Sequence, residues 1–336
     1  MTGGSRNDRA ATGGSWNGGT ATGGETPFDV LTLGETMACL HGSGPLRLGG
    51  DLTLSIAGAE TNVAIGLARL GHTARWAGVV GADELGALVL RTLRAEAVDT
   101  GTVRIDPERP TGLLIQENRI GDVSRVHYYR SGSAGSALGI ADVTAALTAG
   151  GPPGILHVTG ITPALGPGPR AAVEHAVRRA QELGTRVCLD VNHRARLWDA
   201  AAASAVLGPL LPYVDVLVAS YDELPIVAPG GAGDALAAGV AEVVVKHGSA
   251  GAEVWAGGEH VRLPARRVPV ASTIGAGDAF VAGYLSGLLD GLSPAGRLER
   301  GVTLGAFAVA THGDWHGLPT REELGLLSLA AGDTVR

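Results

Sequence analysis

The chain is organised around the stretch Ala271-Ser272-Thr273-Ile274-Gly275-Ala276-Gly277-Asp278-Ala279-Phe280-Val281-Ala282-Gly283-Tyr284. A strand-like run at residues 268–271 leads into it, and an apolar, helix-like run at residues 279–289 leads out. A strand, a Gly-rich turn and a helix leave unpaired backbone N–H groups at the helix start, where they attract anions such as phosphate. Asp278 stands at that helix start, where its carboxylate could take a proton from a hydroxyl nucleophile.

The same five letters occur earlier in the chain, as Gly231-Ala232-Gly233-Asp234-Ala235. Gly-rich turns that open helices are common and aspartate is an ordinary residue there, so the letters alone leave function and simple capping open. The earlier copy follows two prolines, Pro225 and Pro229, and no strand leads into it. Context therefore favours the later copy as functional and predicts a loop and helix start for the earlier one.

Composition limits the class of protein. The 336 residues are 45% hydrophobic and 18% charged, which is typical of a soluble globular protein with one large or two medium domains. The net charge of −7 argues against partners such as nucleic acid or an anionic membrane. Cys39 and Cys188 lie in strand-like apolar runs, which indicates buried thiols in a reducing compartment. Without a membrane-length apolar run or a signal-peptide core, the sequence predicts a cytoplasmic protein.

The chain divides into a tail and one folded unit. Residues 1–26 are rich in Gly, Thr, Ser and Asn without apolar periodicity, so we expect a disordered tail there and a folded domain over 27–336. The domain contains apolar, unalternating strands that alternate with helices, which predicts an α/β fold with a mainly parallel sheet sandwiched by helices. The predicted strands are 28–33, 75–80, 155–159, 186–191, 214–219, 242–246 and a hairpin at 254–263; the predicted helices are 63–70, 83–97, 169–183, 199–210, 279–289 and 297–311.

Two early regions do not fit this parallel sheet. Residues 36–56 and 103–130 contain short alternating strands and the turn signals Gly49-Gly50 and Gly121-Asp122. We expect them to form a small β-strand lid beside the main sheet.

Polar and glycine-rich residues follow the predicted strands. Ligands of parallel sheets bind beyond the carboxyl ends of the strands, so these residues should gather at one edge. They are Gly34-Glu35, Asn192-His193-Arg194, residues 220–223, Lys246-His247-Gly248 and residues 275–278. The sequence has no P-loop motif, no protein-kinase motif set and no His/Cys spacing typical of a metal site.

Five segments carry a resemblance to a known family. They are residues 57–71 (AGAETNVAIGLARLG), Tyr128-Tyr129-Arg130-Ser131-Gly132-Ser133-Ala134, residues 190–194, residues 220–223 and residues 273–278. On these segments the chain resembles the ribokinase-like (PfkB) family of carbohydrate kinases over about residues 28–328, and it is most similar to the 2-dehydro-3-deoxygluconate (KDG) kinase branch. The resemblance implies a ribokinase-like fold and transfer of the γ-phosphoryl group of ATP, with Mg²⁺, to the primary hydroxyl of a sugar acid.

The resemblance also assigns roles. Asp278 resembles the catalytic base, and Gly275, Ala276 and Gly277 resemble an anion hole for the transferring phosphoryl group. Substrate contacts would come from Gly58, Ala59, Glu60, Asn62, Tyr128, Arg130, Arg194 and Asp278, and an arginine suits a carboxylate. Nucleotide contacts would come from Asn192, Ser220, Lys246, Gly248, Gly251, Gly275 and Gly277. Glu223 resembles an acid that holds Mg²⁺ through water.

Some of these residues admit plainer interpretations. Arg194 could be a surface arginine, Glu223 an acid in an early helical turn, and Asn62 a helix cap. Tyr128 and Tyr129 alternate on a strand, so we expect one of them to pack and the other to contact ligand.

Three positions depart from the family pattern. Ser272 stands where the family usually has an aspartate that helps to bind an activating monovalent cation, so a K⁺ site is uncertain. Leu114 replaces a tyrosine common in KDG kinases, and Thr61 replaces a leucine. Two other functions therefore stay open: a PfkB kinase for fructose or a nucleoside, and a catalytically silent sugar-binding or regulatory protein. The resemblance further implies a possible homodimer through the lid.

Overall fold

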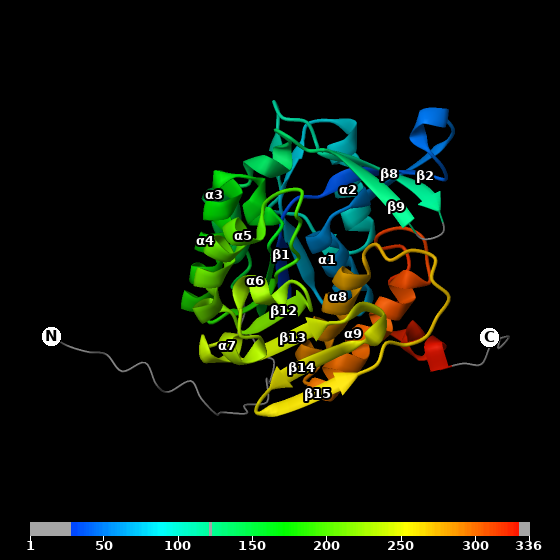
Figure 1. Cartoon of the computed structure of the whole chain (residues 1–336). Helices are drawn as coiled ribbons and strands as arrows, with labels where there is room; N and C mark the ends of the chain where they lie inside the picture. The colour runs from blue at the N-terminus through cyan, green and yellow to red at the C-terminus, as the bar shows by residue number, and fades with distance from the viewer. Residues whose placement is uncertain (1–27, 121–122, 329–336) are drawn as a thin grey trace.

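Nine strands form the main sheet of the computed structural model, which describes residues 28–120 and 123–328 (Figure 1). In sheet order they are β15 (Glu259–Leu263), β14 (Ala252–Ala256), β13 (Glu242–Lys246), β12 (Val216–Ser220), β11 (Arg186–Asp190), β10 (Ile155–Thr159), β1 (Val30–Leu33), β4 (Ala74–Ala77) and β6 (Val98–Asp99). From β13 to β6 all neighbours pair parallel, while β14 and β15 add an antiparallel hairpin. The predicted tail at 1–26 lies outside the described residues.

Helices cover both faces of this sheet, as predicted for strands that are apolar along their whole length. One face packs against α3 (Ile140–Thr148), α4 (Pro167–Glu182), α5 (Ala200–Leu207), α6 (Leu224–Val227) and α7 (Ala232–Ala237). The other packs against α1 (Ala59–Arg69), α2 (Glu84–Ala95), α8 (Ala276–Leu289) and α9 (Pro294–Val309). Short 3₁₀ helices lie at η1 (Leu46–Leu48), η2 (Ala134–Ala137), η3 (Thr162–Leu165), η4 (Gly208–Tyr213), η5 (Gly248–Ala250) and η6 (Glu322–Ser328). The predicted α/β architecture is confirmed.

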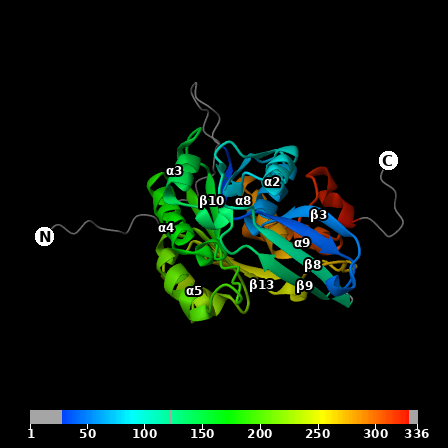
Figure 2. The same ribbon diagram turned by 90° about the horizontal axis from the view of Figure 1, so that it is seen from above.

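A second, four-stranded sheet forms the lid. Its order is β3 (Leu52–Ala57), β2 (Met37–Gly42), β8 (Leu113–Ile120) and β9 (Val123–Tyr129), and Figure 2 shows β3, β8 and β9 side by side from above. β2 and β8 pair parallel, and the other pairs are antiparallel. The turn predicted at residues 121–122 lies outside the described residues.

Three predicted elements differ in the structure. No strand forms at residues 268–271, where Pro269 lacks a backbone donor and Ala271 N and Ser272 N both donate to Val309 O. The run at 75–80 breaks at Gly78, because β4 belongs to the main sheet whereas β5 (Val79–Gly81) pairs with β7 (Arg104–Asp106). The residues of β7 were predicted to be part of the lid.

The topology places a binding edge beside β1. The chain runs from β1 to β4 and β6 on one side and later returns to β10 on the other, so the strand order reverses between β1 and β10. Crevices at such reversals are the usual ligand sites of parallel sheets. No helix within residues 28–120 and 123–328 combines the length and apolar composition that a membrane span needs.

Candidate active site

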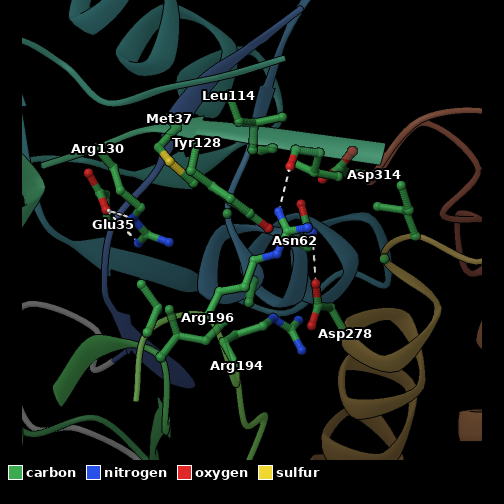
Figure 3. Close-up of a pocket in the computed structure, with 18 of the residues that line it drawn as sticks. Glu35, Met37, Asn62, Leu114, Tyr128, Arg130, Arg194, Arg196, Asp278 and Asp314 are labelled. Carbon is green, nitrogen blue, oxygen red and sulfur yellow. Dashed lines mark hydrogen bonds and ion pairs between the residues drawn. The ribbon is translucent and has the colours of Figure 1, made fainter. Parts of the chain in front are cut away.

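A cavity of about 910 Å³ lies between the lid and the carboxyl ends of the main-sheet strands (Figure 3). It is lined by the loops after β1, β10 and β11, by the start of α1, by the start of α8 and by lid residues. Every residue predicted to contact substrate lines it: Gly58, Ala59, Glu60, Asn62, Tyr128, Arg130, Arg194 and Asp278. The structure therefore brings these separate segments of the sequence to one cavity.

The N-terminus of α8 forms one wall of the cavity. Gly275 caps the helix with φ +75°, and a Cβ atom there would lie 2.0 Å from the backbone oxygen of Asp314. Only glycine fits this left-handed conformation without strain. Gly277 follows in the first turn, and a Cβ there would lie 3.6 Å from Lys246 Nζ. Ala276 N donates to Thr273 O at 3.4 Å, but the other first-turn amides have no partner inside the helix, so this helix start suits an anion.

Asp278 is buried in the first turn of α8 and is held by two amide side chains. Asn62 Nδ2 donates to its Oδ2 at 2.8 Å (Figure 3). Asn192 Nδ2 donates to its Oδ1 at 3.4 Å. Burial raises the pKa of Asp278 to about 6, against the opposing effects of the Asn62 hydrogen bond and the charge of Arg194. A carboxylate with this pKa is ionised at neutral pH and can still accept a proton.

The two asparagines are positioned by their backbones. Asn192 follows β11 with φ +36°, a conformation that asparagine adopts more readily than most residues. α1 begins at Ala59 with Gly58 as its N-cap, so the interpretation of Asn62 as the cap is wrong. Asn62 Oδ1 is buried without a hydrogen-bond partner among the described residues. The Asn62 side chain therefore holds Asp278 with its amino group and retains a free acceptor at the cavity.

Glu60 lies near β1 and β10, between which the strand order reverses, and its carboxylate is already hydrogen-bonded within the protein. Its Oε1 accepts hydrogen bonds from Thr159 Oγ1 at 2.6 Å and from Thr162 Oγ1 at 2.8 Å. Gly34 leaves room for it, because a Cβ there would lie 2.3 Å from Glu60 Cδ. Burial raises the pKa of Glu60. These contacts anchor the start of α1 to β10.

Arg130 is paired with Glu35, a residue to which the sequence assigned no role. Its Nε and Nη2 lie 2.8 and 2.5 Å from Glu35 Oε2, and Ser133 Oγ donates to Oε1 (Figure 3). Gly112 and Gly135 make room for the glutamate, since a Cβ on either would overlap its side chain. The guanidinium is thus held in one orientation, and its charge is largely balanced within the protein.

Arg194 differs from Arg130 in having no such partner. Its guanidinium makes no hydrogen bond or ion pair with any residue that the structure describes, and in Figure 3 it extends toward Asp278. Arg196 crosses to the lid, where its Nη1 donates to Val126 O at 3.0 Å. Arg194 is exposed and lines the cavity, so its guanidinium is available to a ligand.

The prediction that one of the two lid tyrosines packs is wrong. Tyr128 is 43% exposed and lines the cavity, and Tyr129 is 62% exposed. The lid is a single sheet layer, so alternate residues of β9 face either the cavity or the outside of the molecule.

The residues predicted to bind nucleotide lie at the neighbouring strand ends. Ser220 ends β12, and Lys246 ends β13. Gly248 begins η5 and Gly251 caps it, in the connection to β14. Lys246 Nζ lies 2.8 and 3.0 Å from the two carboxylate oxygens of Asp190. Burial lowers the pKa of Lys246, but Asp190 and other nearby carboxylates outweigh burial, so its pKa is raised and it stays charged.

Glu223 links two of these strand ends. Its Oε1 accepts from His193 N and its Oε2 from Ser220 N, both at 2.8 Å. Each carboxylate oxygen keeps a second lone pair for water or another donor. The residue precedes α6, but its hydrogen bonds go to backbone outside that helix.

Asp314, in the loop after α9, lines the cavity and was missed by the sequence interpretation. It is 8% exposed, and its Oδ1 has no hydrogen-bond partner among the described residues. Burial, then the charge of Asp278, raises the pKa of Asp314 to about 7. No local motif marks this aspartate; only the packing of its loop on Gly275 brings it to the site.

The earlier copy of the five-letter motif lies elsewhere. α7 begins within it, Gly231 has φ +83°, and Asp234 Oδ2 accepts from Gly230 N at 2.5 Å. None of its residues lines the cavity. Its glycines and aspartate make a loop and open a helix.

Comparison with known proteins gives consistent matches along the chain. A model described as pfkB family carbohydrate kinase matches residues 29–321. Two relatives are 37% identical: 2-dehydro-3-deoxygluconokinase of Bacillus subtilis (strain 168), over 88% of this chain and 94% of the relative, and that of Thermoproteus tenax, over 88% and 92%. The crystal structure of 2-dehydro-3-deoxygluconokinase from Thermotoga maritima is 25% identical with a TM-score of 0.81, covering 90% of this chain and 99% of that one.

Proposed function

Because this chain belongs to the pfkB family of carbohydrate kinases, we propose that it phosphorylates 2-dehydro-3-deoxy-D-gluconate at its primary hydroxyl, with ATP as phosphoryl donor, to give the 6-phosphate. One observation carries the proposal beyond the family: the buried Asp278 and Arg194, which has no partner among the described residues, line one cavity at the start of α8. A base and a free cation in that cavity suit a substrate with both a hydroxyl and a carboxylate.

Asp278 is the proposed catalytic base. With Asn62 and Asn192 holding its carboxylate, it would accept the proton of the attacking hydroxyl as the oxygen bonds to the γ-phosphorus and the bond to the β-phosphate oxygen breaks. The amides of Gly275 and Gly277 would stabilise the negative charge on the transferring group, whereas Ala276 N already donates to Thr273 O at 3.4 Å. Lys246 Nζ uses two N–H groups on Asp190 and could donate its third to a phosphate oxygen. Positioning and electrostatics would supply most of the rate.

The strand ends beside the cavity fit ATP and Mg²⁺. The glycine-lined start of α8 leaves room for phosphate oxygens, and Lys246, which is paired with Asp190, lies next to Gly277. Glu223 and Asn192 offer oxygen atoms, which Mg²⁺ prefers, and water could lie between them and the ion. When bound, Mg²⁺ neutralises phosphate charge. Ser220, Gly248 and Gly251 would contact the nucleotide.

Two arginines of the cavity would recognise different features of the sugar acid. Arg194 would bind its carboxylate, whereas Arg130, balanced by Glu35, would contribute directed hydrogen bonds. Asn62 Oδ1 and Asp314 Oδ1, both without partners among the described residues, would accept hydrogen bonds from sugar hydroxyls.

A substrate panel tests the proposal. The enzyme would be assayed with ATP and Mg²⁺ on 2-dehydro-3-deoxygluconate, fructose and a nucleoside, each with and without K⁺ because Ser272 replaces the usual aspartate. Highest kcat/KM on the sugar acid supports the proposal. A higher kcat/KM on fructose or the nucleoside would indicate a PfkB kinase for a neutral sugar. Sugar binding without phosphoryl transfer would indicate a catalytically silent sugar-binding protein.

Arg194→Met is expected to raise the KM for the sugar acid about 10- to 100-fold with a smaller change in kcat, because a charge-assisted contact to a carboxylate is worth about 1.5–3 kcal/mol. Steady-state kinetics on the sugar acid measure this. The matched control is Arg186→Met, an exposed arginine at the opposite end of β11, which should leave KM unchanged. Equal KM values for Arg194→Met and the wild type would remove Arg194 from the substrate site.

Activity is expected to fall at acid pH. Asp278 must be ionised to accept a proton, and its pKa is about 6, so kcat/KM should be level above that pH and decline about tenfold per unit well below it. Asp314 also titrates near this range, with a pKa of about 7, so the profile is repeated on Asp314→Asn, where the limb near pH 6 should persist. A flat profile from pH 5 to pH 8 in folded enzyme would contradict the role of Asp278.

The outer face of the lid supports a homodimer. Leu52 and Leu54 on β3 are 41% and 48% exposed, and Tyr129 on β9 is also exposed. By strand register they share one face with Leu40 and Ile115, opposite the face that lines the cavity. A second copy of the chain, pairing lid to lid, would cover this apolar surface.

Leu54→Asp is therefore expected to shift a dimer to a monomer, because it places a charge in the apolar contact. Light scattering coupled to size-exclusion chromatography measures the mass. Leu236→Asp, on exposed α7, is the control and should leave the mass unchanged. A wild-type monomer at micromolar concentration would contradict the dimer.

A further inference from the structure

The lid carries a Cys-x-His pair to which the proposed reaction assigns no part. Cys39 and His41 alternate along β2, so both side chains point to the same face of the lid. Cys39 is the register partner of Leu114, which lines the cavity, so this is the inner face. Cys39 is fully buried and His41 is half-buried.

Asp314 completes a cluster of three metal-ligating side chains. The Cys39 sulfur, a His41 ring nitrogen and an Asp314 carboxylate oxygen all lie within 4.8 Å of one another, and Cys39 Sγ is 3.1 Å from His41 Nε2. In a tetrahedral site with the usual zinc bond lengths, ligand atoms are about 3.5 Å apart. Small side-chain rotations would therefore bring all three donors onto one ion.

The unpartnered oxygen of Asp314 is an independent sign of a missing ligand. Its Oδ1 is buried without a hydrogen-bond partner among the described residues, and such atoms are rare because losing water without a substitute costs free energy. The loop is also fixed in place, since Trp315 Nε1 donates to Ile56 O at 3.1 Å. A sugar hydroxyl would satisfy this oxygen alone, whereas a metal ion would engage the neighbouring thiol and imidazole as well.

We propose that Cys39, His41 and Asp314 bind a divalent cation of the zinc class, which ties β2 of the lid to the loop after α9 and inhibits the enzyme. Thiolate, imidazole and carboxylate are the ligand types of Zn²⁺, whereas Mg²⁺ prefers oxygen ligands alone, so the site is distinct from the one for the catalytic metal. Binding releases the Cys39 thiol proton to solvent, and the charge of the ion offsets the cost of a buried thiolate.

Inhibition is expected because the ion would occupy the Asp314 carboxylate, which lines the active-site cavity. Asp314 would no longer accept a hydrogen bond from substrate, and the ion would cross-link β2 of the lid to the loop after α9 over the cavity. This consequence rests on the proposed kinase function, whereas metal binding itself does not.

Cobalt tests the binding site without reference to activity. EDTA-treated full-length protein is titrated with Co²⁺, and we expect a thiolate-to-cobalt charge-transfer band in the near ultraviolet. Cys39→Ser should abolish the band, and His41→Ala should weaken cobalt affinity at least about tenfold. Cys188→Ala is the matched control, because the only other cysteine of the chain is buried in β11, and it should retain the band. No band in the wild type, or a band lost only in Cys188→Ala, would overturn the proposal.

Zinc inhibition tests the consequence. Phosphoryl transfer is measured at saturating Mg²⁺ and ATP with increasing Zn²⁺, and His41→Ala should need at least about tenfold more Zn²⁺ for half-inhibition than the wild type. Equal inhibition of both proteins would overturn the inhibitory role. If the wild type transfers no phosphoryl group, the proposed function fails, while the cobalt titration still decides the metal site.

Discussion

Asp278→Asn is expected to lower kcat about 10³-fold while ATP binding survives. General-base catalysis contributes about 10²–10⁴-fold, and an asparagine amide cannot accept the hydroxyl proton. The substitution keeps the shape of the side chain and one oxygen to accept from Asn62. Single-turnover phosphoryl transfer and calorimetric titration with ATP separate the two quantities. Near-normal turnover would remove Asp278 as the base.

The fold should not suffer from this change. The pKa of Asp278 is raised to about 6, above that of an exposed aspartate, so at neutral pH the charged carboxylate is less favourable in the folded than in the unfolded chain. A neutral amide removes that cost but leaves Asn192 Nδ2 without its acceptor, so the thermal midpoint should stay close to that of the wild type. Loss of activity with a lowered midpoint would point to unfolding.

The earlier motif copy supplies the control. Asp234 occupies the same place in the same five letters, but its carboxylate accepts from Gly230 N and does not reach the cavity. Asp234→Asn should therefore leave kcat within about twofold of the wild type. A loss similar to that of Asp278→Asn would mean that both effects are structural.

Gly275→Ala is expected to lower both kcat and stability. The left-handed backbone costs a residue with a Cβ about 1–2 kcal/mol. The new atom would also lie 2.0 Å from Asp314 O, and relieving that overlap costs roughly 1–3 kcal/mol more. Moving the start of α8 displaces the amides of the anion hole, whose loss typically costs about 10²–10³-fold in kcat. Denaturant unfolding and kcat, measured on the same preparation, check both effects.

Gly231→Ala separates backbone strain from overlap. Gly231 has φ +83° at the start of α7, yet a Cβ there would meet nothing within 4 Å. With ψ −156° the residue lies in a region essentially restricted to glycine, so the variant should lose about 1–3 kcal/mol of unfolding free energy and keep its kcat. Equal losses of kcat in the two alanine variants would show that the start of α8 has no special role.

Much of the architecture was predictable because it depends on the hydrophobic patterns of short sequence segments. Apolar, unalternating strands between amphipathic helices specify a parallel sheet with two covered faces, and such sheets bind ligands at their carboxyl ends. Asp278, Asn62 and Arg194 were placed in the site by this rule and by the family resemblance, and they line one cavity. Errors arose where local signals conflicted: residues 268–271 are strand-like in composition, but Pro269 has no donor and no strand pairs with them.

The sequence by itself determined the fold class, the family and the helix start that carries the proposed base, because each depends on residues close together in the chain. Only the tertiary structure decided how distant side chains are paired. Glu35 balances Arg130 across 95 positions, whereas Arg194 has no such partner among the described residues. Asp314 meets Cys39 and His41 only because the loop after α9 packs beneath the lid. The physical reason is that charge balance and metal ligation depend on distances of a few ångströms, which chain separation does not report.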